Sequence, residues 1–392
     1  MIDIKDKKEC CGCNACVQAC PLHCISMEAD EEGFWYPKAD SNVCIKCGKC
    51  DMVCPVINAE HIQNENEDKI AGEQPQTYIA YVLDEQLRKQ SSSGGIFGII
   101  AHEILHDGGV VFGAAYDDAY RVRHIHIENE SDMRILQGSK YVQSDIGDTY
   151  NETLKVLKQG RKVFFTGTAC QIAGLKQFLG RDYDNLLTAD VLCHGTPSPK
   201  LWKMYIDYLK KVNNSDIYSV NFRDKSIGWK RFSMRVQFDN NELCEPFYNN
   251  KYMNMFLGNI CLRPSCHACH FKSLTRPSDI TMGDCWGIEN YKPELDDDMG
   301  ASVVLINSAK GLRLFEKVSD RLIYKRAETD KALPPQSDSR KSVAMHFNRN
   351  KFFNAMQKGA DIDTLVKYLE PSFARKVVRK VKRIIKRFYK NR

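Results

Sequence analysis

The sequence predicts a small α+β cysteine-rich module, followed by a mixed α/β domain and a helical C-terminal region. A cysteine pattern that occurs twice before residue 55 predicts the module. Strand-like and helix-like segments that alternate from Thr77 predict the α/β domain. The chain has 392 residues, more than one small core needs, so we expect the module to be joined to one larger domain or to two.

The module is defined by two copies of the pattern C-x2-C-x2-C-x3-C-P. The first copy contains Cys10, Cys13, Cys16 and Cys20, and the second contains Cys44, Cys47, Cys50 and Cys54. This is the pattern of bacterial two-cluster ferredoxins, in which the fourth cysteine of each run binds the 4Fe-4S cluster of the other run. We therefore assign one cluster to Cys10, Cys13, Cys16 and Cys54, and the second to Cys20, Cys44, Cys47 and Cys50.

Zinc and disulfides are the alternatives for these cysteines. Zinc sites usually take two C-x2-C pairs, and a disulfide framework would accompany a secretory signal, which the polar start MIDIKDKKEC does not resemble. Seventeen cysteines therefore indicate metal and redox chemistry in a reducing compartment. Cys11 and Cys24 fall outside the pattern, and we interpret them as spare thiols.

Composition divides the chain into five parts. They are the two-cluster module (1–57), a polar, acidic linker (58–76), the α/β domain (77–330), a helical region (331–370) and a basic amphipathic tail (371–392). Within the α/β domain, strands are predicted near 77–83, 110–116, 162–167, 186–193, 279–284 and 302–308, with more β-structure inside 216–240. Helices are predicted near 96–105, 169–179 and 200–212, and the chain beyond residue 308 is expected to be mainly helical. Strands separated by such helices indicate a largely parallel sheet.

Three loops at the ends of predicted strands contain glycine and hydroxyl groups, and α/β folds bind ligands at such strand ends. They are SSSGG (91–95), GSKYVQS (138–144) and FTGTACQIAGL (165–175). The amides that follow SSSGG would suit a phosphate at the N-terminus of a helix. SSSGG is also an ordinary helix start, so this loop alone does not establish a phosphate site.

A second group of cysteines lies in the α/β domain. Cys193 occurs in CHGTPS, Cys170 stands at a predicted helix start, and CLRPSCHACH contributes Cys261, Cys266 and Cys269. Four thiolates could converge on one more cubane, or a C-x2-C pair could form half of a zinc site with a nearby histidine. Spacing alone leaves both interpretations open.

One short segment, HEILH (102–106), matches the zinc-protease motif H-E-x-x-H. Asp107 and the two glycines after it end the helix, and no third ligand is apparent downstream. We therefore interpret this match as accidental.

Taken together, SSSGG, GSKYVQS, FTGTACQIAGL, CHGTPSPKLW and SDITMGDCWG resemble the coenzyme F420 hydrogenase/dehydrogenase beta subunit family, and most closely its bacterial members with an N-terminal two-cluster ferredoxin. The resemblance extends from about Cys10 to Asn307. It implies that the mixed α/β domain binds a flavin, FAD or FMN. It further implies that iron-sulfur clusters exchange electrons with this flavin, and that the flavin exchanges hydride with coenzyme F420 or another small organic acceptor.

The resemblance also implies site residues. It places a flavin near Ser92, Ser93, Gly94, Gly95, Lys140, Thr166, Gly167 and Thr168. It places a third 4Fe-4S cluster at Cys193, Cys266 and Cys269, with Cys170 or Cys261 as the fourth ligand. No side chain is implied as a covalent catalyst. Cys285 stands where the family pattern has an aromatic residue, and we expect it to be a core thiol.

We therefore expect a flavin-dependent iron-sulfur oxidoreductase whose partner is a redox protein such as a ferredoxin or a hydrogenase-type subunit. The alternative is a non-enzymatic electron carrier or a membrane-surface adaptor that retains the fold.

Positive charge is concentrated in the tail. The net charge is +6, but residues 371–392 contain ten Lys and Arg and no acid, which leaves 46 basic and 50 acidic residues in the body. Apolar tail residues at helical spacing predict an amphipathic helix on an anionic membrane surface, with packing on the body as the alternative; nucleic acid is disfavoured. No apolar run approaches the roughly 20 residues that span a bilayer. We expect a cytoplasmic protein held peripherally at the inner face of the membrane.

Overall fold

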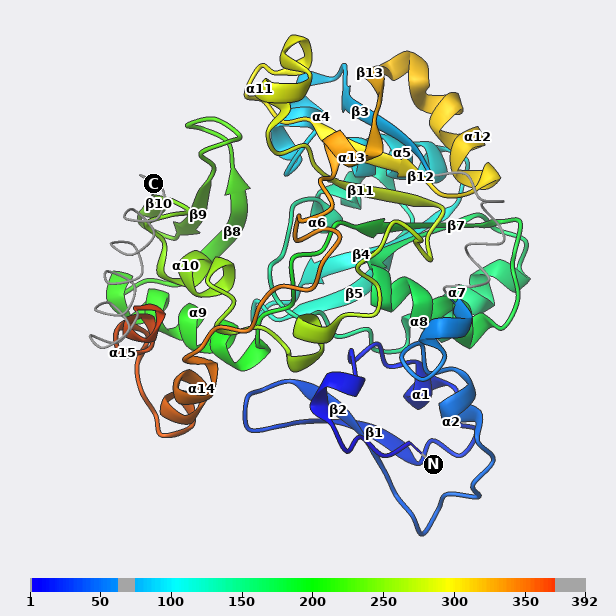
Figure 1. The fold of residues 1–392 in the computed structure, drawn as a ribbon, viewed down its shortest axis with the longest axis vertical. Coiled ribbons are helices and arrows are strands. Elements are labelled where there is room, and N and C mark those ends of the chain that lie inside the picture. The colour runs from blue at the N-terminus through cyan, green and yellow to red at the C-terminus, as the bar shows by residue number, and fades with distance from the viewer. Residues whose placement is uncertain (1, 63–74, 371–392) are drawn as a thin grey trace, which may run out of the picture.

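The computed structural model describes residues 2–62 and 75–370. A small N-terminal module lies at one end of a larger α/β body, and a second, smaller sheet lies beside the main one (Figure 1). The main sheet has eight strands, the smaller sheet has three, and the module contains a two-stranded hairpin. The body is therefore mixed α/β, as predicted.

The N-terminal module is built from one hairpin and two helical turns. β1 (Ile25–Ala29) pairs with β2 (Trp35–Ala39) in antiparallel register, α1 (Ala15–Gln18) lies in the first cysteine run, and α2 (Lys49–Met52) lies in the second. The aromatic and β-forming residues 33–40 contain the second strand of this hairpin.

The two cysteine loops share one backbone conformation. Gly12 and Asn14 have φ values of 71° and 65°, and Lys46 and Gly48 have φ values of 57° and 74°. These residues occupy equivalent positions on either side of the second cysteine of each run. Left-handed residues turn the chain sharply and let successive backbone amides face one concave site. The sequence repeat is thus also a structural repeat.

The main sheet has a parallel centre and antiparallel edges. Its strand order is β13-β3-β12-β11-β7-β6-β4-β5. The central strands β4 (Val110–Tyr116), β6 (Val163–Thr168), β7 (Leu186–Val191) and β11 (Ile280–Asp284) run parallel. Each outer strand is antiparallel to its inner neighbour: β5 (Val122–Ile127), β12 (Ser302–Ile306), β3 (Gln76–Val82) and β13 (Leu322–Ala327).

The prediction of a largely parallel sheet is therefore wrong for the outer strands. Antiparallel neighbours need no helical crossover, so β5 and β12 follow β4 and β11 through connections without a long helix. β13 lies in a stretch that we predicted to be helical. Only Leu322 of this edge strand is buried, so the strand carries little alternating pattern.

Helices cover both faces of the main sheet. α5 (Ile96–His106) and α12 (Ala309–Val318) pack on one face, and α7 (Thr149–Lys158) and α8 (Ala169–Leu179) pack on the other. In β6, Phe164 belongs to the first core, whereas Val163 and Phe165 belong to the second. Such strands are apolar on both sides, as is typical of parallel strands buried between two helical layers.

The smaller sheet has its own core. Its strands are β8 (Ile217–Asp224), β9 (Ser233–Phe238) and β10 (Glu242–Pro246), and they pair antiparallel. They pack with α9 (Pro199–Asn213), α10 (Lys251–Leu257), α14 (Arg349–Gln357) and α15 (Ile362–Val366) around buried aromatic side chains that include Trp202, Phe222, Tyr252 and Phe352.

Short helices complete the described chain. They are α4 (Glu85–Gln90), α6 (Met133–Leu136), α11 (Ile288–Tyr291), α13 (Thr329–Ala332) and single 3-10 turns that include η1 (Lys7–Glu9) and η3 (Pro264–Ala268). Residues 331–370 contain α14, α15 and the final 3-10 turn Lys367–Leu369. The tail and residues 63–74 of the predicted linker lie outside the described residues. Within residues 2–62 and 75–370, no helix has the length and apolar character needed to cross a bilayer.

A buried ion pair joins the end of β7 to the loop before β11. Arg276 Nη2 lies 2.9 Å from Asp190 Oδ1, and Nε lies 3.2 Å from Oδ2. The side chains of Arg276 and Asp190 are 2% and 0% exposed. Neither charge can be solvated if its partner is lost, so the pair fixes this loop to the sheet.

We expect Arg276→Met to lower the free energy of unfolding by about 3 to 5 kcal/mol, because it leaves the Asp190 carboxylate buried without a partner. The measurement is the thermal midpoint by circular dichroism under anaerobic conditions. Lys203→Met is the matched control, because Lys203 forms an exposed i,i+4 pair with Asp207 and should cost less than about 1 kcal/mol. Equal midpoints for the two variants would contradict the assigned role of the buried pair.

Candidate functional site

Four of the predicted cluster ligands surround a hollow at the outer end of the module. Cys20 of the first run meets Cys44, Cys47 and Cys50 of the second run there. Cys24 lines the same hollow, with its Sγ 3.3 Å from that of Cys20. The backbone N–H of Lys46 donates to Cys44 Sγ at 3.4 Å. We call this the outer hollow.

The other four predicted ligands surround a second hollow. Cys10, Cys13 and Cys16 meet Cys54 of the second run. Each run thus places its last cysteine in the hollow of the other run, which is the arrangement that the cysteine spacing predicts. Ile2, Ile4, Met27 and Val56 supply apolar walls to this space. We call this the inner hollow.

The thiols line hollows and do not converge on a point. Among residues 2–62 and 75–370, no three His, Cys, Asp or Glu side chains are placed to hold one metal ion. A tetrahedral Zn²⁺ with Zn–S bonds of about 2.3 Å would draw its sulfurs to about 3.8 Å from one another. In a cubane each thiolate binds a different iron, so the four sulfurs lie farther apart. Two groups of four thiols, with no histidine or carboxylate among them, are the donor set that two 4Fe-4S clusters would use.

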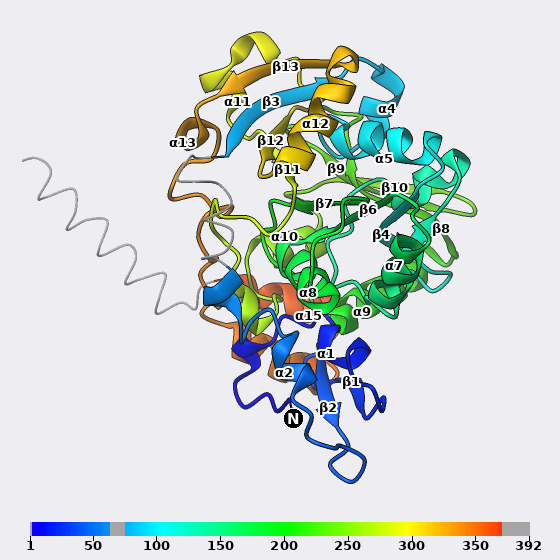
Figure 2. The ribbon, with the colours of Figure 1, turned by 90° about the vertical axis from the view of Figure 1, so that its right-hand side faces the viewer.

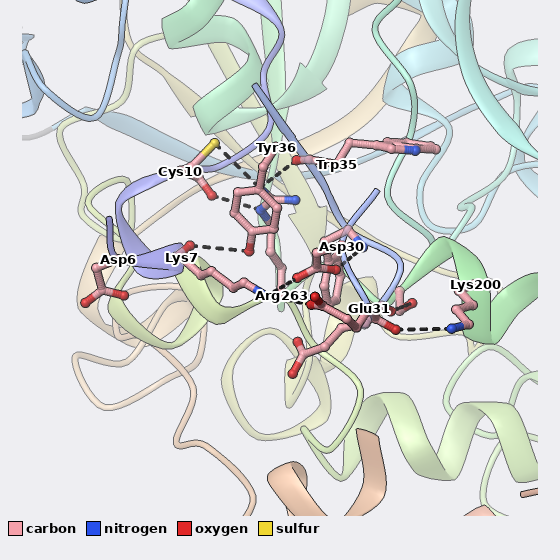
Figure 3. A network of polar contacts seen from close by, with 12 residues as sticks. Asp6, Lys7, Cys10, Asp30, Glu31, Trp35, Tyr36, Lys200 and Arg263 are labelled. Carbon is pink, nitrogen blue, oxygen red and sulfur yellow. Dashed lines mark hydrogen bonds and ion pairs between the residues drawn. The ribbon is translucent and has the colours of Figure 1, made fainter. Parts of the chain in front are cut away.

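Arg263 follows α10 in the body, and its side chain reaches into the module (Figure 3). There it binds the cysteine loop that lines the inner hollow. Its Nε donates to Cys10 O at 2.8 Å, and its Nη2 donates to Trp35 O at 2.9 Å and lies 3.6 Å from Cys10 Sγ. Its guanidinium carbon lies 4.2 Å from the centre of the Tyr36 ring. A buried cation therefore lies next to a predicted cluster ligand.

Other contacts fix the module on the body. Gln18 Oε1 accepts from the backbone N–H groups of Tyr150 and Asn151, and Asn14 Nδ2 donates to Gly147 O at 2.7 Å. Figure 2 shows α1 below α8, and these helices are in contact. Gly174 of α8 permits this approach, because a Cβ there would lie 3.0 Å from Cys13 Sγ.

The third group of thiols lies in the body beside the inner hollow. Cys170 begins α8, Cys193 follows β7, and Cys266 and Cys269 lie in and after η3. Burial, followed by the closeness of Cys266 and Cys170, raises the pKa of the Cys193 thiol. Burial and the neighbouring Cys170 raise the pKa of Cys269 to about 12. These four thiols, which we call the body group, are therefore mutual neighbours.

The two candidates for the fourth position differ in their surroundings. Cys170 is electrostatically coupled to Cys193, Cys266 and Cys269. Cys261 is fully buried in the core of the smaller sheet, where burial raises its pKa and Arg349 is its principal charged neighbour. The charge interactions with Cys193, Cys266 and Cys269 thus favour Cys170 over Cys261 as the fourth member.

Cys11 connects the inner hollow to the body group. Its thiol lies within hydrogen-bonding reach of Cys13 and of Cys170. It packs with Cys54, Cys170 and Cys269 around a small core that contains Val56 and Phe271. The sequence pattern did not single out this position, because Cys11 falls between two pattern cysteines.

The predicted flavin loops lie at one edge of the main sheet, where the parallel strands end. Ser139 donates to Ser92 Oγ through its backbone N–H at 2.8 Å and its hydroxyl at 3.0 Å. Gln171 Nε2 donates to Ser144 Oγ at 2.9 Å. The three loops that were separate in the sequence are therefore joined through the segment 138–144.

Lys140 lacks a carboxylate partner among the described residues. Its Nζ donates to the carbonyls of Leu136, Gln137 and Gly138, at 3.1 to 3.4 Å. Removal of its ammonium from bulk water lowers its pKa to about 7. A cation held only by carbonyls is a suitable partner for an anionic ligand.

His124 lies near Lys140 and is neutral at pH 7. Burial lowers its pKa to about 4. Its Nε2 lies 3.0 Å from Thr166 O, which places the proton on Nε2 and leaves Nδ1 as an acceptor. Nδ1 and the hydroxyl of Tyr116 are buried polar atoms without a hydrogen-bond partner within the described chain. Two unsatisfied atoms beside an unpaired cation fit a polar ligand at this edge.

The remaining predicted flavin residues have structural partners. Ser93 Oγ donates to Ala301 O, Gly94 N donates to Ser302 Oγ, and Thr166 Oγ1 donates to Phe112 O. Thr168 caps α8. Gly95 directly precedes α5 as its N-cap residue and has a φ of 89°. It has no side chain to cap the helix, so the first amides of α5 stay available to a phosphate.

Two other sequence predictions can be compared with the structure. Cys285 is 1% exposed in a core with Trp229 and Ile288, so it is a core thiol, as predicted. In HEILH, Glu103 pairs with Lys317 and Arg321, and both histidines face Glu130. The Glu103 carboxylate is therefore occupied by two cations and is not free to bind a zinc-bound water. This agrees with the interpretation that HEILH matches the zinc-protease motif by accident.

The sequence analysis missed Arg263, Tyr116 and His124. Arg263 occurs inside the cysteine loop CLRPSCHACH, and its position between cysteines was the one signal available. Tyr116 and His124 lie on adjacent antiparallel strands with their side chains on the same face of the sheet, a relation that depends on the β4–β5 register.

Known proteins resemble parts of this chain. Residues 160–331 match the family model that describes the C terminus of the coenzyme F420 hydrogenase/dehydrogenase beta subunit. The ketoisovalerate oxidoreductase subunit VorC of Methanothermobacter marburgensis is 34% identical over 62 residues, which cover 15% of this chain and 78% of VorC. The ferredoxin 7Fe of Hydrogenibacillus schlegelii is 43% identical over 47 residues, which cover 12% of this chain and about half, 54%, of that ferredoxin.

One solved structure covers more of the chain. A chain of the F420-reducing NiFe hydrogenase complex from Methanosarcina barkeri aligns over 75% of this chain and 91% of its own length, with 17% identity and a TM-score of 0.46. The match to residues 160–331 includes β6, β7, β11, β12 and the cysteines of the body group. This part of the chain, residues 160–331, belongs to the coenzyme F420 hydrogenase/dehydrogenase beta subunit family.

Proposed function

We propose that this chain is a flavin-dependent iron-sulfur oxidoreductase that exchanges hydride with coenzyme F420 or another small organic acceptor. The observation that carries the proposal is the gathering of twelve cysteines in three adjacent groups of four. Family membership supports an oxidoreductase, and the similarity to a ferredoxin and to an oxidoreductase subunit supports iron-sulfur electron transfer.

The proposed ligands are the thiols of the three groups. Cys20, Cys44, Cys47 and Cys50 would hold the outer cluster, and Cys10, Cys13, Cys16 and Cys54 would hold the inner cluster. Cys170, Cys193, Cys266 and Cys269 would hold the third. The groups follow one another from the module into the body, with Cys11 between the second and the third. This order supports a relay for single electrons.

When bound, the clusters would carry single electrons, and the flavin would exchange electron pairs as hydride. The chain's own residues would set how readily the clusters are reduced. The N–H groups of Lys46 and Thr196 donate to Cys44 and Cys266, and Arg263 places a positive charge beside Cys10. Hydrogen bonds to sulfur and nearby positive charge favour the reduced, more negative state.

The proposed flavin site lies at the carboxyl edge of the main sheet. Lys140 and the first amides of α5 would hold phosphate oxygens. The hydroxyl of Tyr116 and Nδ1 of His124 would satisfy polar atoms of the ligand, since each lacks a partner in the described chain. The bonds that Ser92, Ser93 and Gly94 make within the protein would keep the loop rigid.

Flavin content separates the oxidoreductase from the alternative electron carrier. The protein purified anaerobically should contain about 12 irons and one flavin per chain. The measurements are iron and acid-labile sulfide assays and the absorbance of the extracted flavin. About eight irons and no flavin would instead support a carrier that retains the fold.

Replacement of Cys47 by Ala should lower the iron content by about four atoms per chain, because no neighbouring group replaces a thiolate well. Cys24→Ala is the matched control, since Cys24 lines the same hollow without belonging to the pattern. We expect this control to retain its iron. Full iron content in Cys47→Ala would contradict the ligand assignment.

The fourth ligand of the body group can be identified by two single substitutions. Cys170→Ala should lower the iron content, whereas Cys261→Ala should change it little, because Cys261 lies in the core of the smaller sheet. Iron analysis and low-temperature electron paramagnetic resonance of the reduced proteins provide the measurement. The reverse result would assign the position to Cys261.

The proposed role of Lys140 predicts a pH dependence of flavin binding. Since the pKa of Lys140 is lowered to about 7, its ammonium is charged below that pH and neutral above it. Flavin affinity should therefore be constant below about pH 7 and fall, by up to about 10-fold per pH unit, above it. Isothermal titration of the flavin-free protein measures this. Lys140→Arg, which stays charged, should lose the dependence, and an unchanged pH profile in Lys140→Arg would contradict the role.

A further inference from the structure

The outer hollow opens onto exposed apolar side chains. Ile45 and Met52 are 65% and 70% exposed, and Leu22 and Val43 are also exposed. Leu22 and Ile45 line the hollow itself, and Cys47, which also lines it, is exposed. Scattered apolar residues on a surface need no explanation, but here two of the four line one predicted redox centre, and Val43 and Met52 lie within two residues of its cysteines.

The charged side chains that line this hollow are both cationic, although the Asp51 carboxylate lies 3.7 Å from Cys50 Sγ behind the lining. Among the described residues that line it, the charged ones are Lys46 and Lys49, and both are exposed. Neither forms an ion pair within residues 2–62 and 75–370, in contrast to Lys38 of the same module, which pairs with Glu28. Two ammonium groups without an acidic partner in that part of the chain therefore flank the apolar residues.

The inner hollow is also open on one side, but its cysteine loop is held against the body. Its loop faces the body, where Arg263 binds Cys10 and where Gly174 contacts Cys13. Gln18 and Asn14 hold the same side of the module against α7 and the segment before it. The outer hollow is thus the end of the cysteine series that faces solvent, and an electron that enters or leaves by way of the module has its shortest route there.

We propose that the residues Leu22, Val43, Ile45, Lys46, Lys49 and Met52, which we call the outer docking face, bind an acidic one-electron carrier protein. This inference rests on the proposed function, because it requires a cluster in the outer hollow. The carrier would place acidic residues against Lys46 and Lys49 and an apolar edge against Ile45 and Met52. In the reaction one electron passes from carrier to cluster, or in reverse, and no bond forms or breaks.

The chemistry of the face fits such a partner. Complexes of electron carriers bury little area, and charge complementarity raises their rate of association more than their affinity. A small apolar centre with two flanking cations has these properties. A second copy of this chain fits poorly, because a two-fold axis through the face would bring Lys46 and Lys49 of both copies together.

The test measures how fast the outer cluster is reduced by two donors. The first is a reduced, acidic plant-type 2Fe-2S ferredoxin, which must dock, and the second is dithionite, which need not. Stopped-flow bleaching of the iron-sulfur absorbance in the full chain gives both rate constants. In Lys46→Glu/Lys49→Glu, the ratio of the ferredoxin rate constant to the dithionite rate constant should fall at least about 10-fold at low salt. The decrease should shrink as ionic strength rises.

Lys155→Glu/Lys158→Glu is the matched control. These two lysines of α7 have the same i,i+3 spacing and are exposed, and the double substitution changes the net charge equally. Their rate ratio should match that of the natural sequence. Ile45→Ser should also lower the ferredoxin rate constant, without altering its dependence on salt.

The outcomes separate the docking proposal from the proposed function. An unchanged rate ratio in Lys46→Glu/Lys49→Glu, with iron content intact, would overturn the docking face alone. Loss of binding to phosphatidylserine vesicles with an unchanged ferredoxin rate would assign the face to a lipid surface and also overturn the proposal. A natural-sequence chain without an outer cluster would overturn the proposed function and, with it, the docking face.

Discussion

The structure depends on one constraint: thiols from distant parts of the chain must lie in a row of adjacent groups. Each run of the module lends its last cysteine to the hollow of the other run, so neither half can form its hollow alone. The body supplies a third group from three separate segments that end at one sheet edge or follow it. The contact of Cys11 with Cys170 then requires the module to dock in one orientation on α8.

Cations with little or partial exposure divide into two kinds according to their partners. Arg276, Arg223 and Arg88 are buried, and each pairs with a carboxylate. Arg263 and Lys140 have no carboxylate partner in the described chain and bind carbonyl oxygens instead. Since an unpaired buried charge is costly, these two positions are where anionic sulfur and phosphate groups would be stabilising.

The family relationship and the geometry support each other at different levels. The matched residues 160–331 contain much of the main sheet and all of the smaller one, so family membership accounts for the body. Short stretches of the chain, 62 and 47 residues long, are separately similar to an oxidoreductase subunit and to a ferredoxin. The fixed place of the module against α8, held by Arg263 and Gln18, makes the proposed relay a property of the whole chain, whereas the nature of the final acceptor depends on contacts at the open sheet edge.

The sequence by itself determined the features that depend on local spacing. The repeated cysteine pattern predicted which thiols gather around each hollow, and apolar runs predicted α5, α8, α9 and the central strands, because helix and strand periods are written in neighbouring residues. Only the tertiary structure decided the antiparallel edges of the sheet, the edge strand β13 and the grouping of Cys170 rather than Cys261 with the body thiols. It also decided that Arg263, Tyr116 and His124 face the candidate sites. These features depend on strand register and on docking between segments more than 100 residues apart, and no local pattern encodes such distances.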